Sequence, residues 1–223
     1  LCMNQQHLFT IDIDTGRRTV LWTEQGPAVW SAVGAFDISP SDQVVVSKKG
    51  EIALLENGGL RVVATPATGE RALIGPRWMP DGKRLLVSAR MADNSLAVFV
   101  MPVDGGTRQP IPLPQDITAP MVAPDGTVLY GQNGILWGQR LDAATLAPVG
   151  GPVRIAGDLS MDASSGFMGV SLARSGVLAL RSPSATRVQF EWVDRTGRPD
   201  RKVGTADNFA NFDVSRDGRI VVS

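Results

Sequence analysis

Aspartate recurs in this sequence in one kind of setting, and its carboxylate is a side chain that can bind metal ions or act as an acid or base. Clustered carboxylates bind calcium, and paired ones hydrolyse glycosides. Asp81 and Asp125 stand in the triplet Pro-Asp-Gly, and Asp42 and Asp217 stand in related segments. Asp in such a turn hydrogen-bonds to nearby backbone amides. We therefore expect these four carboxylates to shape turns.

Other reactive side chains are scarce. His7 is the only histidine, and Cys2 is the only cysteine. A Ser-His-Asp triad would have to use His7, and no Gly-x-Ser-x-Gly motif accompanies it. Zinc sites of the usual His or Cys type and intrachain disulfides lack the residues they need. We predict no catalytic residue, metal or cofactor, and hence a chain that is not itself an enzyme.

Charge and hydropathy exclude two classes of partner. The 22 Lys and Arg balance the 22 Asp and Glu, so the chain offers no net field that attracts nucleic acid. An apolar run such as Leu96 to Met101 is far shorter than the ~20 residues that span a bilayer. We expect neither a nucleic-acid partner nor a membrane segment.

Five turn segments recur along the chain and define its architecture. The same position of the five turns is occupied by Pro40, Pro80, Pro124, Arg174 and Arg216. The steps between these residues are 40, 44, 50 and 42 residues. Pro presets φ for the first turn position, Asp tolerates the next, and Gly accepts the positive φ that follows. An aliphatic run follows each turn, so each turn joins two strands. The predicted turn residues are Pro40, Asp42, Pro80, Asp81, Gly82, Pro124, Asp125, Gly126, Gly176, Asp217 and Gly218.

A second hairpin follows the first in each unit, which gives four strands per repeat and no helix. This period is typical of a β-propeller blade. We predict an all-β fold, a β-propeller of four-stranded blades with about five blade equivalents. The expected domain is one partial propeller over 1–223, with blade-like units at 1–34, 35–75, 76–119, 120–168, 169–211 and 212–223. Either the half blades at the two ends close a five-bladed ring, or the chain is a slice of a ring of about six to eight blades, which we favour.

The repeated segments resemble the WD40-like Pro-Asp repeat of TolB-type propellers. The match is best at Trp78 to Gly82 and Val122 to Gly126. Trp192 to Gly197 and Leu141 to Val153 resemble segments in the C-terminal propellers of bacterial receptor-type serine/threonine kinases and related signalling proteins. The resemblance covers nearly the whole chain and implies a binding or sensing module, with a periplasmic or extracytoplasmic location. None of the kinase motifs is present, so any kinase domain lies outside this chain.

Binding residues are expected at the end of each blade opposite the Pro-Asp-Gly turn, where a segment leads into the first strand beside the channel mouth. Loops on a rigid scaffold are where binding residues concentrate. These approach segments are 26–34, 65–76, 114–120, 158–169 and 204–211. Within them we predict ligand or partner contacts from Trp30, Glu70, Arg71, Asp116, Ser164, Asn208 and Asn211.

The sequence favours a non-catalytic propeller that recognises a protein, peptide or small ligand within a bacterial signalling protein. Fold-level analogy is a weak guide to function, so two alternatives stay open. One is the propeller gate of a prolyl-oligopeptidase-type serine peptidase whose catalytic domain lies elsewhere. The other, less favoured, is a lactonase-type propeller enzyme with an axial metal held by Glu70, Asp116, Asn208 and Asn211.

Overall fold

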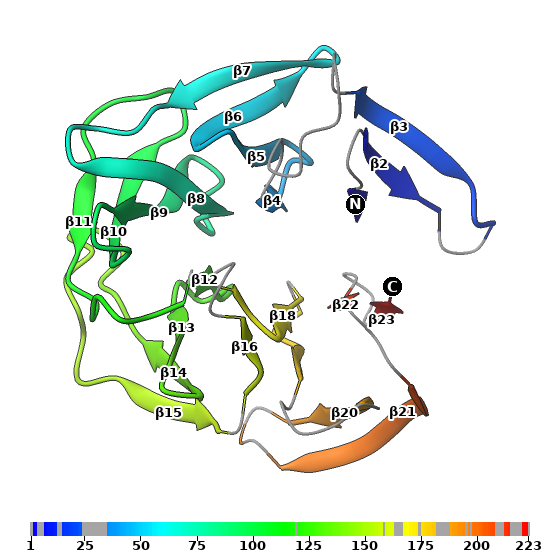
Figure 1. The fold of residues 1–223 in the computed structure, drawn as a ribbon. Helices are drawn as coiled ribbons and strands as arrows, with labels where there is room; N and C mark the ends of the chain where they lie inside the picture. Colours follow the sequence, from blue (N-terminus) through cyan, green and yellow to red (C-terminus); the bar gives the residue numbers. More distant parts are fainter. Residues whose placement is uncertain are drawn as a thin grey trace. The chain divides into compact units, whose positions relative to one another are not determined.

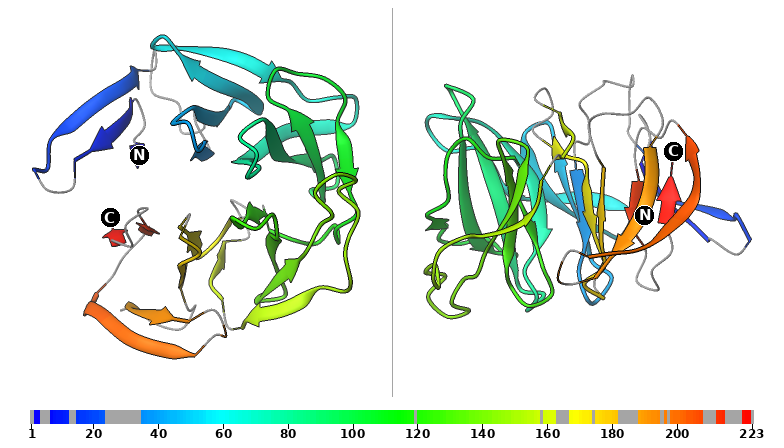
Figure 2. Two further views of the ribbon diagram at one scale, coloured as in Figure 1. Left: turned by 180° about the vertical axis from the view of Figure 1, so that it is seen from behind. Right: turned by 90° about the horizontal axis from the view of Figure 1, so that it is seen from below.

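The computed structural model contains β-strands as its only regular elements in the residues it describes, which confirms the all-β prediction. These residues are 2–3, 7–12, 15–23, 35–118, 120–157, 159–162, 167–173, 175–181, 188–194, 196, 198–207, 212–214 and 220–222. Within those ranges, no helix of the length and hydropathy of a membrane span occurs. The chain divides into two compact units, 1–110 and 111–223 (Figures 1 and 2).

The first unit contains three antiparallel sheets. Its strands are β1 (Cys2–Met3), β2 (His7–Ile11) and β3 (Arg18–Thr23), then β4 (Ala35–Ile38), β5 (Val44–Lys48), β6 (Glu51–Glu56) and β7 (Gly59–Ala64), then β8 (Glu70–Trp78), β9 (Arg84–Met91), β10 (Leu96–Pro102) and β11 (Gln109–Ile111). The sheets β4-β5-β6-β7 and β8-β9-β10-β11 each have four strands in sequence order, as predicted. Strand β8 packs against the sheet β4–β7, so the two sheets lie side by side (Figure 1).

The second unit contains one more four-stranded sheet and four hairpins. The sheet is β12 (Met121–Val122), β13 (Val128–Gln132), β14 (Ile135–Gln139) and β15 (Val153–Ala156). The hairpins are β16 (Met161–Asp162) with β17 (Phe167–Met168), β18 (Val170–Leu172) with β19 (Leu178–Leu180), β20 (Val188–Val193) with β21 (Pro199–Asp207), and β22 (Phe212–Val214) with β23 (Ile220–Val222). All are antiparallel.

The described turns of the Pro-Asp-Gly type join the first two strands of their sheet or hairpin through one hydrogen-bond pattern. In the second turn, the Gly82 amide donates to the Met79 carbonyl at 3.0 Å, and Gly82 has φ 63°. Gly126 and Gly176 repeat this bond at 2.8 and 2.9 Å with φ 85° and 84°. The Asp81 and Asp125 carboxylates accept amide hydrogen bonds two residues on, at 2.8 and 3.0 Å. Asp217 and Gly218 lie outside the described residues.

The first turn keeps this shape without the Pro-Asp-Gly triplet. Asp42 takes the left-handed position with φ 62°, which Asp tolerates better than most side chains do. The Ser39 hydroxyl accepts the Ser41 and Gln43 amides at 3.2 and 3.0 Å, in place of the aspartate carboxylate of the second and third turns. The turn is therefore stabilised by a different side chain at a neighbouring position.

The core of the first unit lies between its two four-stranded sheets. Val45, Ile52 and Leu54 contribute one side, and Leu85 and Val87 contribute to the other. These side chains alternate along their strands with residues of the opposite sheet face, as the period of two requires. In the second unit, buried residues Leu129, Leu136, Leu159 and Met168 form a comparable core.

The segments that lead into the first strands are less loop-like than the sequence predicts. Residues 65–76 were expected to be loop, yet β8 begins at Glu70. Leu73 causes the difference, because its side chain is buried and its amide donates to the Gly50 carbonyl at 2.7 Å. Leu159 repeats this with Gly134 at 3.0 Å. Each bond ties an approach segment to the turn between the second and third strands of the preceding sheet.

Candidate functional site

Arg71 lies near the start of β8, beside the turn that joins β9 to β10. Its Nη1 donates to the Asn94 Oδ1 at 3.2 Å, and Asn94 has a positive φ of 69°. The neighbouring Asp93 carboxylate accepts the Ser95 hydroxyl and amide at 2.6 and 2.9 Å. These hydrogen bonds, with a smaller attraction from Arg71, lower the pKa of Asp93. The turn thus holds an exposed carboxylate and an exposed guanidinium in fixed positions.

Asp116 has an equivalent place in the second unit, beside the turn between β13 and β14. Gln132 donates from Nε2 to the Asp116 Oδ1 at 2.6 Å. Two residues on, buried Thr118 exchanges hydrogen bonds with Gly131: the Thr118 amide donates to the Gly131 carbonyl, and the Gly131 amide donates to the Thr118 hydroxyl, both at 2.9 Å. The backbone of this approach segment is therefore fixed, and the exposed Asp116 carboxylate is oriented by one amide donor.

Glu70 is engaged in contacts within the first unit. Arg108 Nη1 donates to both carboxylate oxygens, at 3.0 and 2.8 Å, and the Ala67 amide donates at 2.7 Å. Only 13% of the Glu70 side chain is exposed. The Glu70 carboxylate already has a counterion and an amide donor. These contacts hold the segment 65–70, between β7 and β8, in place.

The other predicted binding residues lie outside the described part of the chain. They are Trp30, Ser164, Asn208 and Asn211. Of the described predicted residues, Glu70 and Arg71 are consecutive in β8, and Asp116 belongs to the second unit.

A lactonase-type metal centre requires several ligands in one place. Among the described residues, no group of three or more His, Cys, Asp or Glu side chains comes together. Glu70, one of the proposed ligands, is instead paired with Arg108. In this arrangement the Glu70 carboxylate is occupied by an arginine. Asn208 and Asn211, two more of the proposed ligands, lie outside the described residues.

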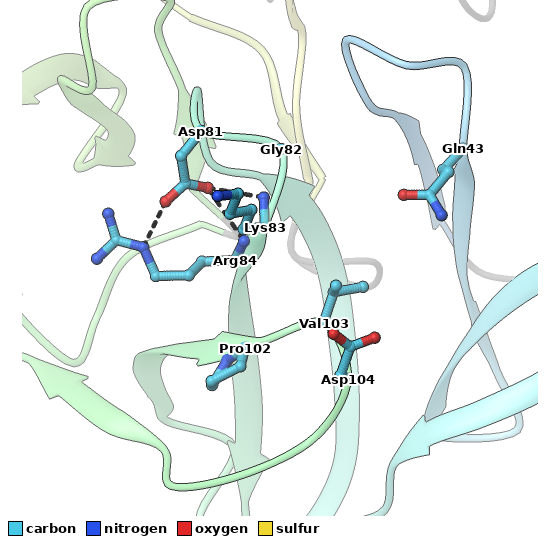
Figure 3. A pocket seen from close by; sticks show the side chains of 8 residues that line it. All are labelled: Gln43, Asp81, Gly82, Lys83, Arg84, Pro102, Val103 and Asp104. Carbon is cyan, nitrogen blue, oxygen red and sulfur yellow. Dashed lines mark hydrogen bonds and ion pairs between the residues drawn. The ribbon is translucent and has the colours of Figure 1, made fainter.

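An open pocket of about 600 Å³ lies at the Pro-Asp-Gly end of the first unit (Figure 3). It is lined by Gln43, Asp81, Gly82, Lys83, Arg84, Pro102, Val103 and Asp104. Partial burial alone would raise the pKa of Asp81, but hydrogen bonds from the Lys83 amide and from Arg84 lower it on balance. Arg84 Nε also lies 2.6 Å from the Asp81 carboxylate, so the contacts of this aspartate are made within its own turn.

Sequence reasoning missed a polar contact between the first strands of two sheets. The Asp37 carboxylate in β4 accepts the Trp78 amide of β8 at 2.8 Å and the Ile38 amide at 2.9 Å. Next to Trp78, Arg77 donates from Nη1 to the Phe36 carbonyl at 3.2 Å. The available signal was a charged residue, Asp37 or Arg77, three positions before Pro40 and Pro80 and next to apolar residues.

Comparison with solved structures identifies the fold. A gluconolactonase from Xanthomonas campestris matches with TM-score 0.67 and 14% identity over 96% of this chain and 73% of that one. Regucalcin, a calcium-binding protein from Agrobacterium tumefaciens, matches with TM-score 0.63 and 16% identity over 98% and 75%. An oligogalacturonate lyase in complex with manganese matches with TM-score 0.57 and 12% identity over 95% and 62%. Neither a family model nor a curated protein sequence matches.

These similarities confirm the predicted β-propeller. Identities of this size show the fold alone, and they support propellers in general. The finer resemblance to TolB-type propellers of bacterial signalling kinases is not supported by them and stays a prediction from the sequence.

The expectation that this chain is not an enzyme is contradicted by the same comparisons. The gluconolactonase and the oligogalacturonate lyase are enzymes, and their matches cover 96% and 95% of this chain. The absence of a Ser-His-Asp triad and of His or Cys metal ligands excludes only some catalytic mechanisms. Carboxylates and other polar groups also act as acids, bases and charge stabilisers.

Proposed function

We propose that this chain is the propeller of an enzyme that binds and converts a small sugar-derived molecule, either a lactone or a sugar acid. The observation that carries the proposal is the paired polar side chains on approach segments, Arg71 with Asn94 and Asp116 with Gln132. In both units, an exposed charged group is hydrogen-bonded to a polar side chain: Asn94 on the turn between β9 and β10, and Gln132 at the end of β13. Fixed polar groups of this kind orient a polar ligand at little entropic cost.

The substrate class comes from the neighbours in fold. Gluconolactonase and oligogalacturonate lyase are named for a sugar lactone and a sugar-acid oligomer. Arg71 offers further N–H donors to a hydroxyl or carboxylate, and Asp116 offers an acceptor to hydroxyl groups. Trp30, Ser164, Asn208 and Asn211 belong to this proposal from the sequence alone.

Lactone hydrolysis by the full chain tests the proposal. Proton release from D-glucono-1,5-lactone is followed at constant pH, with the spontaneous rate in buffer subtracted, and further sugar lactones are compared. We expect saturable hydrolysis and a drop in kcat/KM of about tenfold or more, equivalent to about 1.4 kcal/mol, in the variant whose residue contacts the lactone. Arg71→Ala and Asp116→Ala are measured separately, because the two residues belong to different units. Arg61→Ala, which changes an exposed arginine of β7 paired with Glu56, is the matched control and keeps full activity.

Two results count against this function. Hydrolysis no faster than in buffer for every lactone would remove the lactone class. Equal kcat/KM for wild type, Arg71→Ala and Asp116→Ala would remove the assigned residues.

A second candidate is recognition of a peptide, which the family resemblance implies. The observation that favours it is β15, the outermost strand of its sheet, where Val153 and Ile155 are 62% and 40% exposed. An exposed apolar edge strand accepts an extended peptide by backbone pairing. Hydrogen exchange at 153–156 tests this: a bound peptide slows exchange there, and unchanged exchange on peptide binding excludes this edge.

A further inference from the structure

Arg77 stands on β8 next to the first strand of the neighbouring sheet. Strands β4 and β8 are the first strands of two four-stranded sheets of the first unit, and they lie side by side (Figure 1). Arg77 Nη1 is anchored on the Phe36 carbonyl at 3.2 Å. The residue as a whole is half-buried, and its guanidinium end is held on the backbone of β4.

The Arg77 guanidinium has no counterion in the described part of the chain. The ion pairs found there join other arginines to carboxylates: Arg61 to Glu56, Arg84 to Asp81 and Arg108 to Glu70. In addition, Arg77 Nε is buried and has no hydrogen-bond partner. A guanidinium carries five N–H donors and a permanent charge, so partial burial with one neutral acceptor is unfavourable.

Asp37, an acidic residue of β4, is engaged by the backbone. Its carboxylate oxygens accept backbone amides from Ile38 and from Trp78. These bonds hold Asp37 to the backbone of β4 and β8. A cation left without a counterion beside a fixed neutral anchor is the arrangement expected of a site that an external anion completes.

We propose that Arg77 binds the carboxylate of a small polar ligand. A planar guanidinium matches a carboxylate better than it matches a spherical ion, because two N–H groups can point at two oxygens. This inference rests on the proposed function for the choice of a sugar acid as ligand. Arg77 lies in a different part of β8 from Arg71, so the two residues can be tested separately.

Binding of D-gluconate to the full chain, with inorganic phosphate and neutral glucose as comparison ligands, tests the proposal. The arginine Nε–H signals are followed by NMR during titration, and Kd is measured by calorimetry. We expect a saturable shift of the Arg77 signal with gluconate and a Kd at least about tenfold tighter than for glucose. Arg77→Gln weakens gluconate binding about tenfold or more, and Arg61→Gln leaves it unchanged.

Several outcomes would overturn the proposal. These are an unshifted Arg77 signal at saturation, equal gluconate affinity in Arg77→Gln, or a shift with phosphate alone. The wild-type titration needs no variant, so an Arg77→Gln chain that fails to fold leaves the test intact. Gluconate binding at Arg77 without lactone turnover would remove the proposed function and keep this site. Lactone turnover with an unchanged KM in Arg77→Gln, together with an unshifted Arg77 signal, would keep the proposed function and remove the Arg77 site.

Discussion

The Arg108 guanidinium holds the Glu70 carboxylate with two hydrogen bonds of 3.0 and 2.8 Å. It also donates to the Thr65 carbonyl, and it lies 4.5 Å from the centre of the Phe99 ring. One arginine thus connects the segment between β7 and β8 to the sheet that follows. Glu70, which the sequence places among the ligand-binding residues, anchors the approach segment that carries Arg71.

Replacing Arg108 should destabilise the first unit. The Arg108 and Glu70 side chains are 25% and 13% exposed, so Arg108→Met leaves a carboxylate largely shielded from water without its counterion. We expect a loss of about 1–3 kcal/mol in the free energy of unfolding, measured with urea. Arg61→Met breaks the exposed pair with Glu56 and is the control, with no measurable change expected. An equal effect of both substitutions would mean that burial of the Arg108 pair is unimportant.

The turns were predictable because their geometry is local. Pro-Asp-Gly encodes its own φ values and hydrogen bonds within five or six residues, and the turns at Gly82 and Gly126 have them. The turn at Gly176 keeps the glycine and its hydrogen bond without Pro or Asp. The start of β8 was not predictable, because it depends on Leu73 pairing with Ala89 and bonding Gly50, contacts that join distant segments. The exposed state of Arg71 and the ion pair of Glu70 depend on the same long-range contacts.

Gly50 should be intolerant of a side chain for two reasons that can be separated. Its φ is 81°, and an added Cβ would lie 3.1 Å from the Ala72 Cβ of β8. Gly58 has a similar φ of 75°, with open space around an added Cβ. Gly58→Ala should therefore cost only the backbone strain, about 1 kcal/mol, and Gly50→Ala should cost more.

Thermal and urea unfolding of both glycine variants measure this difference. Because the Gly50 carbonyl accepts the Leu73 amide, Gly50→Ala should also speed hydrogen exchange at Leu73. Equal stability of the two variants would show that β8 yields to the methyl group without loss of packing.

Asp142 should titrate below the ordinary range of an aspartate. Its Oδ1 accepts the Thr145 amide and hydroxyl, both at 2.8 Å, and the Ala144 amide at 3.1 Å, and these bonds lower the pKa of Asp142. Thr145→Val removes the hydroxyl and keeps the side-chain shape. The pKa of Asp142 should then rise towards its usual value of about 3.9, as measured by NMR of the carboxyl carbon.

The lowered pKa of Asp142 also determines how the stability of the folded chain changes at acid pH. A carboxyl with a lower pKa in the folded chain stabilises it above the pKa of the unfolded chain, and this stabilisation disappears as pH falls through the folded value. Thr145→Val should therefore lose less stability on acidification than wild type does. Thr107→Val, at an exposed position of the segment between β10 and β11, is the control and should follow wild type. A pKa of Asp142 that stays low in Thr145→Val would assign the shift to the amides alone.

Gly131 in β13 should be the least replaceable glycine beside the Asp116 segment. Its φ is not positive, so backbone strain plays no part, but an added Cβ would lie 2.9 Å from the Thr118 Oγ1 and 3.1 Å from the Met168 Sδ. The Thr118 side chain cannot turn away without losing the hydrogen bond that its hydroxyl accepts from the Gly131 amide. Overpacking of this kind costs about 1–3 kcal/mol.

Gly131→Ala should accordingly lower the urea midpoint and disturb the segment that carries Asp116. Gly151→Ala is the matched control, because Gly151 also lacks a positive φ and an added Cβ there meets nothing within 4 Å. If Asp116 binds substrate, Gly131→Ala should raise KM for the lactone at a temperature where the variant is fully folded, and Gly151→Ala should not. Thr118 lies two residues from Asp116. A raised KM in Gly131→Ala without any loss of stability would therefore mean that the substitution displaces the Asp116 carboxylate.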